Sequence, residues 1–264
     1  MALSSPEIED LRTAKSLLER PALAAKISDL VGAPIEKGIE LLPKKWNVVV
    51  NNATRKSTET ALDVALWTMD HNQRASPSNW WHKLAVGTTG ALGGAFGLPA
   101  LPVELPVSTT IMLRSIADIA RSEGVNLKTP DARLQCVQVL ALGGKAKSDD
   151  ATETGYFAAR AAMAKAVSDA AAHLAEKGLW QRGAPAIIRL ITQIASRFSI
   201  VVSEKAVAQA MPVVGTLGGA VINTLFVDHF QNMGRGHFIV QRLERLHGPE
   251  DVKRVYKELE INRG

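Results

Sequence analysis

The stretch that combines the most polar chemistry with apolar surroundings is "NTLFVDHFQNMGRGHF". It contains Asp228, His229 and His237, and an aspartate beside a histidine can act as a general base or bind a metal. His229 and His237 are eight residues apart, whereas helical histidines that share one ion are spaced by four. The spacing therefore favours a structural network of hydrogen bonds or ion pairs, in which Asp228 pairs with a basic residue such as Arg114 or Arg235.

Other charged positions stand in apolar or helical surroundings. Glu104 lies in "PALPVELP", directly after a long run without charges. Arg114, Asp118 and Arg121 share one helical face, which is typical of a local charge ladder and also suits an anionic headgroup or a partner. The chain has no pattern of a nucleophile elbow, a metalloprotease, a cysteine pair or a phosphate-binding loop. The sequence thus predicts no catalytic residues, no metal site and no cofactor.

The elements that hold these residues are predicted to be helices. Ser5 with Pro6 indicates a helix start, Gly124 a helix end, and Thr129 the cap of a following helix. Gly248 separates two helices near the C-terminus. No long stretch alternates with period two, and no Asn-Gly or Asp-Gly hairpin turn is present. We therefore expect an all-α fold, a compact multi-helix domain of about ten helices.

Two apolar segments, residues 84–103 and 206–227, contain no charge and are rich in glycine. On a helix, the glycines of the first segment would line one face. Glycine inside a helix costs ~1 kcal/mol relative to alanine, and close approach of a second helix would compensate for that cost. We expect these two glycine-rich apolar helices to pack on each other and to form the centre of the domain, with contacts at Gly87, Gly90, Gly94, Gly97, Gly215 and Gly219.

The same two segments raise the question of a membrane span. Prolines at 99 and 212 limit each charge-free helix to about 15 residues, or ~22 Å, against a hydrocarbon core of ~30 Å. The three prolines of "PALPVELP" would also leave carbonyls unsatisfied in lipid. Buried core helices are the favoured interpretation. A hairpin that dips into one leaflet is the alternative, because Trp80, Trp81 and Lys83 precede the first segment.

Composition excludes several classes of protein. The net charge of +5 is spread thinly along the chain, whereas nucleic-acid-binding proteins concentrate it on one face, so no nucleic-acid partner is expected. The single cysteine, Cys136, excludes a disulfide framework and is predicted to be a buried structural thiol. The N-terminal stretch lacks the pattern of a secretory signal, which predicts a cytoplasmic location.

Several ordered motifs resemble the EcsC family. They are "GGAFGLPALPVELP", "EGVNLKTPDARLQCVQVLALGG", "GYFAARAAMAKAV" and the long C-terminal run that begins with "EKAVAQAMPVVGTLGG". The resemblance covers roughly residues 75–258, which implies an EcsC-like all-α domain over 75–264 and amphipathic helices over 1–74 that pack on it. The family is bacterial and transporter- or membrane-associated, and offers no agreed catalytic residues to carry over. Family members often have an aspartate near the position of Glu104, so a carboxylate is kept.

Together these observations predict a non-enzymatic accessory protein, cytoplasmic and peripheral on the bacterial inner membrane. Its expected partner is a membrane lipid or a membrane protein such as an ABC transporter, and its oligomeric state stays open. A hydrolase that uses Asp228, His229 and His237 is one alternative. A soluble carrier of a small apolar ligand, held between glycine-faced helices, is the other.

Overall fold

The computed structural model describes residues 3–19, 23–32, 34–40, 44–68, 100–144, 155–177, 183–210 and 215–260. Within these ranges the regular structure is helical and contains no strand, which confirms the predicted all-α class. The first glycine-rich segment, with Gly87, Gly90, Gly94 and Gly97, lies outside the described residues.

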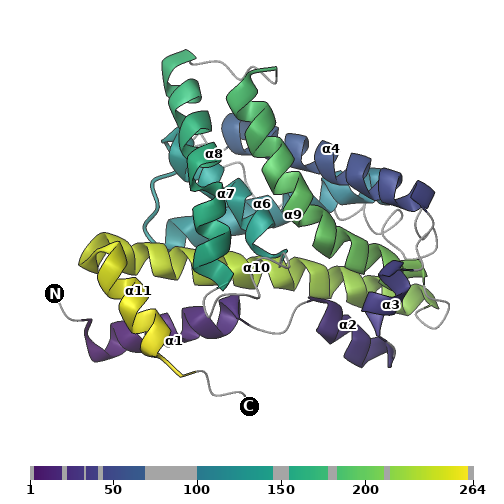
Figure 1. Ribbon diagram of the computed structural model, residues 1–264, viewed down its shortest axis with the longest axis horizontal. Coiled ribbons are helices and arrows are strands. Elements are labelled where there is room, and N and C mark those ends of the chain that lie inside the picture. The colour runs from purple at the N-terminus through teal and green to yellow at the C-terminus, as the bar shows by residue number, and fades with distance from the viewer. Residues whose placement is uncertain are drawn as a thin grey trace.

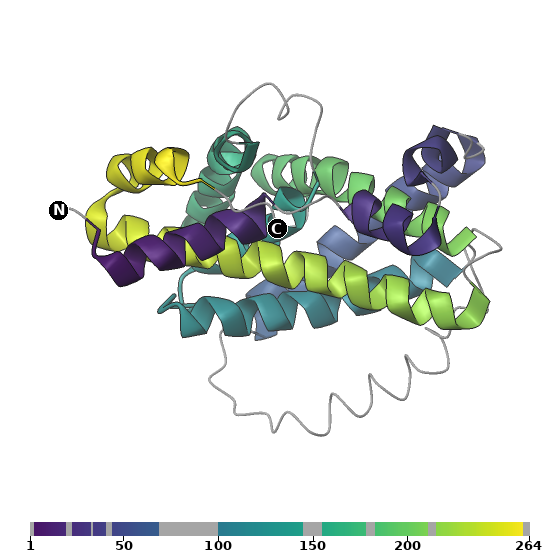
Figure 2. The same cartoon turned by 90° about the horizontal axis from the view of Figure 1, so that it is seen from below.

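A single long helix, α10, runs through most of the length of the molecule (Figures 1 and 2). It comprises 33 residues, Gly215–His247, and spans about 50 Å at the standard helical rise. Two helices pack along it: α6 (Leu101–Ser122) and, on its C-terminal half, α1 (Ser5–Leu18). Close approach of α1 depends on Gly236, because a Cβ there would lie 2.7 Å from Leu18 Cγ.

The remaining helices complete the core around α6 and α10. Helix α4 (Lys44–Thr68) packs on α6 and on α9 (Pro185–Ala210). Helices α7 (Pro130–Leu142) and α8 (Gly155–Lys177) pack on each other and on α9. The short helices are α2 (Leu23–Val31) and α3 (Ile35–Glu40), which contact α9, and α11 (Pro249–Glu258), which contacts α10. Burial of Cys136 in α7 agrees with the sequence prediction and raises the pKa of its thiol to about 12.

Local sequence explains most of the helix boundaries. Thr129 caps α7 by accepting a hydrogen bond from the amide of Ala132, as predicted. Gly124 and Gly248 have positive φ angles, +76° and +87°, and follow the ends of α6 and α10. The first helix is capped at Ser4 and not at Ser5, because the Glu7 carboxylate accepts hydrogen bonds from both the amide and the hydroxyl of Ser4.

The stretch "PALPVELP" differs from its prediction. We expected its prolines to leave carbonyl groups without hydrogen-bond partners, but α6 begins at Leu101 and includes both Pro102 and Pro106. Pro102 lies in the first turn, where an amide has no intrahelical acceptor, so its missing N–H costs nothing there. Only Pro106 interrupts the helical hydrogen bonds, and the core contacts of Leu101 and Leu105 compensate for that loss.

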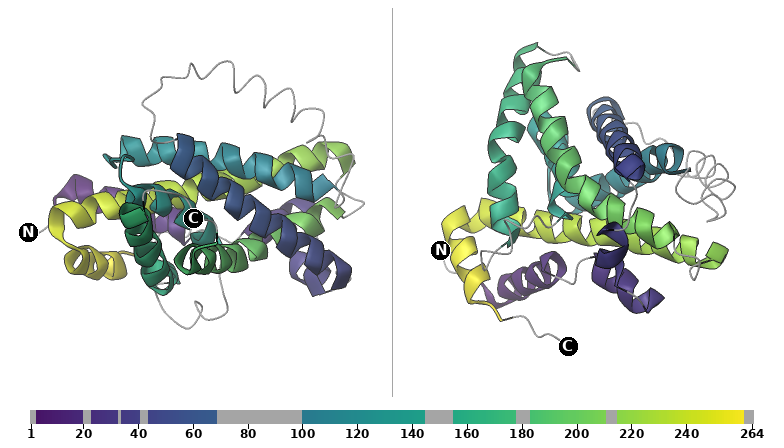
Figure 3. Two further views of the ribbon diagram at one scale, coloured as in Figure 1. Left: turned by 90° about the horizontal axis from the view of Figure 1, so that it is seen from above. Right: turned by 45° about the vertical axis from the view of Figure 1, so that its right-hand side comes forward.

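Helix directions give the molecule two distinct ends (Figures 1 and 3). At one end lie the N-terminal turns of α4, α6 and α10, the C-terminal turns of α9, and both α2 and α3. At the other end lie α1, α11 and the C-terminal turns of α10. We call the first the apolar end, defined by its exposed Leu30, Val48, Val103 and Val221, and the second the ion-paired end, defined by Asp10, Glu123, Arg160, Arg242, Glu244 and His247.

Candidate functional site

A buried ion pair lies beneath the surface of the apolar end. Glu104, in the first turn of α6, accepts a hydrogen bond from Lys205 in α9, with 2.6 Å between Oε1 and Nζ. The two side chains are 7% and 0% exposed. Lys205 Nζ also donates to Asn223 Oδ1 of α10 at 2.7 Å and lies 4.4 Å from the centre of the Phe226 ring. This cluster therefore ties three helices together at the point where they reach the apolar end.

Burial and pairing act in opposite directions on Lys205. Removal from water lowers the pKa of its ammonium, while the Glu104 carboxylate and its hydrogen bond raise it. Glu104 also suits the N-terminal turn of a helix, where a negative charge is favourable. Next to Lys205, Glu204 is buried as well, and its carboxylate accepts a hydrogen bond from the amide of Ala24, which anchors the start of α2. Such a cluster orders helix ends; its side chains are not open to a substrate.

Above this cluster, large apolar side chains are exposed to water. Val103 is the neighbour of Glu104 in sequence and is 69% exposed. Val48 of α4 is 59% exposed, and Val221 of α10 is 43% exposed. Leu30 of α2 adds a fourth exposed side chain, at 52%. The N-terminal turns of α4, α6 and α10, which carry Val48, Val103 and Val221, lie at the same end of the molecule. Exposed apolar side chains at one end indicate an interaction surface.

The beginning of α4 adds a charged and an aromatic residue to this end. Lys45 is exposed and Trp46 is half-buried, two residues before the exposed Val48. No acidic residue lies in the first turn of α4 or of α10, and the single acid in the first turn of α6 is the buried Glu104. The N-terminal turns of α4, α6 and α10 therefore expose a lysine and, among the described side chains, no carboxylate.

The structure separates the three residues that the sequence grouped as Asp228, His229 and His237. Asp228 is exposed, which contradicts the expected buried carboxylate, and among the described residues it forms no ion pair with Arg114 or Arg235. His229 is buried, and its Nε2 lies 3.0 Å from the carbonyl oxygen of Gly143. Helical periodicity explains the difference, because one face of α10 turns toward the core and the opposite face carries Asp228.

His237 belongs to a different network, at the ion-paired end. Its Nδ1 lies 2.9 Å from the hydroxyl of Tyr156, and its Nε2 lies 3.0 Å from Gln241 Nε2. Burial, with the nearby Arg160 guanidinium, lowers the pKa of His237 to about 3, so the ring is neutral. Burial also raises the pKa of Tyr156 to about 12. Both ring nitrogens of His237 are engaged, and the ring is fully buried, so it serves as a structural hydrogen-bonding group.

Comparison with known protein families shows which part of the chain matches a family. The model of the EcsC protein family matches residues 8–243. The chain belongs to the EcsC protein family. No match was found among curated proteins or among solved structures. The matched range includes the whole cluster of Glu104, Lys205 and Asn223 in this EcsC family member, and it begins well before residue 75, where the sequence resemblance started.

Arg114 and its neighbours lie on α6 of this EcsC family member, whereas Asp228 lies on α10. Asp118 pairs with Arg121 at 2.6 Å in an exposed ion pair, as the predicted charge ladder requires. Arg114 is half-buried, and partial burial lowers the pKa of its guanidinium while Asp118 raises it. The pair of Asp118 and Arg121 therefore forms the local charge ladder on α6.

Close helix contacts occur at glycines other than those predicted. Gly215 is the first residue of α10, and Gly219 is buried, but their predicted partner lies outside the described residues. The tight positions are Gly143, where a Cβ would meet Phe230 and His229, Gly144, where it would meet the backbone of Arg197, and Gly236, where it would meet α1. The Arg160–Glu244 pair was also missed, because its residues are 84 positions apart and no local pattern connects them.

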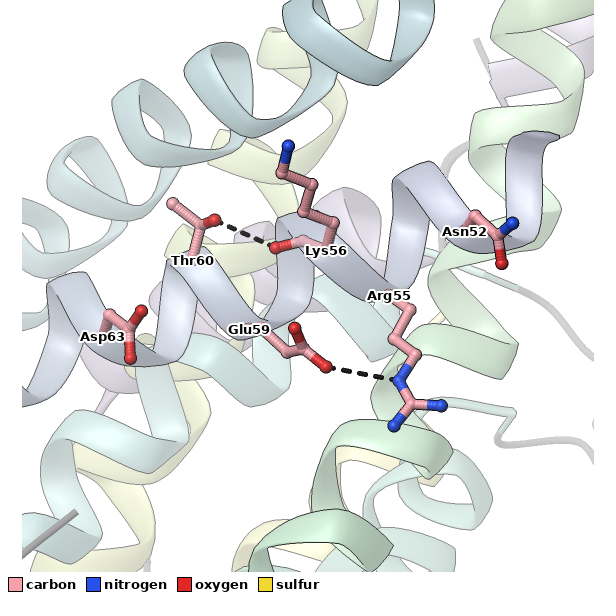
Figure 4. A pocket seen from close by; sticks show the side chains of 6 residues that line it. All are labelled: Asn52, Arg55, Lys56, Glu59, Thr60 and Asp63. Atoms are coloured by element: carbon pink, nitrogen blue, oxygen red, sulfur yellow. Dashed lines mark hydrogen bonds and ion pairs between the residues drawn. The ribbon is translucent and has the colours of Figure 1, made fainter. Parts of the chain in front are cut away.

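A shallow polar groove lies on α4 (Figure 4). It has a volume of about 660 Å³, and in it Arg55 pairs with Glu59 at 3.2 Å while the hydroxyl of Thr60 donates to the carbonyl of Lys56. Its lining contains Asn52, Arg55, Lys56, Glu59, Thr60 and Asp63. None of these is a histidine or a cysteine, and in the described part of the chain no three metal-binding side chains gather to hold an ion.

Proposed function

We propose that this EcsC family member is a non-enzymatic accessory protein that binds the surface of the bacterial inner membrane peripherally through its apolar end. The observation that carries the proposal is the gathering of exposed apolar side chains there. Leu30, Val48, Val103 and Val221 are four of the six large hydrophobic side chains that are exposed in the described part of the chain. Exposure of apolar side chains to water is unfavourable in free energy, and burial of the same side chains in a lipid interface removes that penalty.

The size of the effect favours peripheral over integral binding. Transfer of a half-exposed valine or leucine from water to lipid stabilises by roughly 1 kcal/mol, so four of them contribute roughly 4 kcal/mol. That is far less than a spanning helix provides. One helix in the described residues, α9, is long and apolar enough to cross a membrane by length and composition alone. It also carries the fully buried Lys205 and packs on α4, α7 and α8, so we assign it to the core.

The buried cluster supports the proposal by fixing the shape of this end. Glu104 and Lys205 hold α6 and α9 together directly beneath the exposed Val103. A surface whose helix ends are already ordered loses little conformational entropy when it binds. The hydrolase alternative loses its basis, because Asp228 is exposed while His229 and His237 are buried in separate networks.

Flotation with lipid vesicles tests the proposal. Vesicles of phosphatidylethanolamine and phosphatidylglycerol, three to one, are mixed with the purified chain and floated through a density gradient. The wild-type chain is expected to float with the vesicles, and the triple variant Val48→Ser, Val103→Ser, Val221→Ser to stay at the bottom. The matched control is Ile188→Ser with Leu246→Ser, which changes exposed side chains elsewhere and is expected to float.

Two results would contradict the proposal. Equal flotation of the triple variant and the control would show that the apolar end does not make the contact. Retention of the chain on native membranes after alkaline carbonate, reversed only by detergent, would show integral insertion instead. Thermal unfolding of all variants checks the fold, and little change is expected because the substituted side chains are exposed.

A further inference from the structure

We infer that the apolar end binds the acyl chains that a loosely packed membrane exposes, whatever the charge of the lipid headgroups. The inference rests on the proposed membrane binding and names the feature of the membrane that is bound. The side chains available for the contact are Leu30, Val48, Val103 and Val221, all at one end of the molecule. Each offers carbon atoms and no charge, so burial away from water is what each gains on binding.

The charges of the helices at this end cancel in number. Helices α2 and α3, residues 201–210 of α9 and the N-terminal turns of α4, α6 and α10 carry as many acidic as basic residues: Lys26, Lys37, Lys44, Lys45 and Lys205 against Asp29, Glu36, Glu40, Glu104 and Glu204. Glu104 and Lys205 pair in the interior, and the exposed Lys45 is balanced in number by the exposed Asp29. Attraction to anionic membranes comes from clustered basic residues in excess, and this end has no such excess.

The exposed polar neighbours of the valines are uncharged. On α4, the exposed Asn51 lies one helical turn after Val48. On α10, the exposed Thr224 lies one turn after Val221, and the helix has no charged residue before Asp228. Amide and hydroxyl groups form hydrogen bonds to water and to headgroup oxygens whatever the net charge of the lipid. The surroundings of the valines therefore favour contact with a membrane without selecting its charge.

The side chains that would make the contact are short. A valine ends two bonds beyond the helix backbone, so its methyl groups reach acyl chains only where the headgroups stand apart. Interfacial binding through apolar side chains depends on the curvature and composition of the membrane for this reason. We therefore expect the apolar end to bind strongly curved membranes, whose headgroups are spread apart, better than flat ones.

The types of these side chains also favour lipid over a protein partner. The residues that contribute most to protein interfaces are tryptophan, tyrosine and arginine, whereas valine and leucine are under-represented among them. The large hydrophobic side chains exposed at the apolar end are three valines and one leucine. Acyl chains are fluid and adapt to small side chains, so they do not need a matched pocket.

The test measures partition of the full chain into vesicles that differ in one property at a time. The first series uses dioleoyl phosphatidylcholine vesicles of large and of small diameter. The second keeps the diameter constant and replaces two fifths of the lipid by dioleoyl phosphatidylglycerol. Wild-type partition is expected to rise about fivefold from large to small vesicles, and to stay within about twofold when the anionic lipid or salt is added.

Two pairs of variants locate the contact. Val103→Ser is expected to lower partition into small vesicles about fivefold, whereas Ile188→Ser, at an exposed position in the first half of α9, is expected to bind like the wild type. Asn51→Lys places a new ammonium near Val48 and is expected to make partition rise with the anionic fraction. Thr192→Lys makes the same charge change on α9, away from the apolar end, and is expected to leave partition independent of the anionic fraction.

The outcomes separate this inference from the proposal on which it rests. Wild-type partition that rises with the anionic fraction and falls with salt would overturn the indifference to headgroup charge while leaving membrane binding intact. Equal partition into large and small vesicles would overturn the dependence on lipid packing. A dimer in sedimentation that the triple variant Val48→Ser, Val103→Ser, Val221→Ser abolishes would assign the surface to a second copy of the chain. Absence of partition into every vesicle would overturn the proposed membrane binding itself.

Discussion

The two ends of the helical bundle differ in where their charged and apolar side chains lie. At the ion-paired end, Arg242 contacts Asp10 and Glu123, and Arg160 contacts Glu244, and each pair joins residues far apart in the sequence. At the apolar end, the corresponding charge pair, Glu104 with Lys205, is buried inside, and valines face the water. One end therefore satisfies its charges at the surface, and the other keeps its charges inside and leaves apolar groups outside.

This difference indicates which end is free to meet a partner. Ion pairs at the ion-paired end hold α1 against α10, and Lys15 of α1 donates to the carbonyl oxygens of Tyr256 and Leu259 at the end of α11. Those contacts satisfy charged side chains at that end. The apolar end has its internal order provided by the buried pair, so its surface side chains contribute little to stability. Stability and binding are thus assigned to different side chains of the same helices.

The largest expected effect comes from breaking the buried pair. Glu104→Ala would leave the Lys205 ammonium buried without its carboxylate, and removing one partner of a buried ion pair costs about 3–5 kcal/mol of the free energy of unfolding. Urea unfolding measures it. The double variant Glu104→Ala, Lys205→Met removes both charges and is expected to regain part of the loss. If Glu104→Ala unfolds at the wild-type urea concentration, the pair does not order the apolar end.

A pH change is expected to act on the ion-paired end. The pKa of His237 falls from its ordinary 6.5 to about 3 in the folded chain, so the unfolded chain binds a proton that the folded chain does not. The contribution of a neutral His237 to stability is complete above pH 6.5 and is lost as the pH falls toward 3. Lowering the pH from 7 to 5 is expected to cost about 2 kcal/mol at this site. His237→Gln is expected to lower the free energy of unfolding at pH 7 and to make it less dependent on pH, as measured by urea unfolding between pH 7 and pH 5. If the variant and the wild type lose the same free energy over this range, His237 is not buried as a neutral ring.

A smaller effect is expected where α1 approaches α10. A Cβ at Gly236 would lie 2.7 Å from Leu18 Cγ and 3.0 Å from the carbonyl oxygen of Ala14. Overpacking costs about 1–3 kcal/mol, and the better helix propensity of alanine returns ~1 kcal/mol, so Gly236→Ala is expected to lose about 1 kcal/mol. Calorimetry of Gly236→Ala and of Gly183→Ala measures it, because a Cβ at Gly183 meets nothing within 4 Å. Equal melting temperatures of the two variants would show that α1 is not held at this contact.

Local signals predicted the helices well and the site poorly, for physical reasons. Thr129, Gly124 and Gly248 mark helix ends through interactions within a few residues, so the sequence contains the necessary information. Glu104 was recognised as unusual, but its partner Lys205 lies 101 residues away and only the packing of α6 on α9 reveals it. Asp228 was misassigned because apolar residues flank it in sequence, while the helix turns it away from the core.

The sequence patterns did not predict which apolar side chains are exposed to water. Val48, Val103 and Val221 look like core residues in sequence, because a valine within an apolar helical stretch is usually buried. Conversely, Lys205 is a lysine with no exposed surface, which its sequence neighbours do not predict. Both depend on how the ends of several helices meet, and that arrangement is set by tertiary packing.

The most direct test of the account labels one end at a time. Cys136 is buried and its thiol pKa is raised to about 12, so a thiol-reactive, environment-sensitive dye should label only an introduced cysteine. Val103→Cys at the apolar end and Leu246→Cys at the ion-paired end replace similarly exposed side chains, 69% and 61%. On vesicles containing phosphatidylglycerol, we expect the dye at position 103 to shift its emission to the blue and the dye at position 246 to stay unchanged. Equal shifts at both positions, or a shift at 246 alone, would contradict membrane binding through the apolar end.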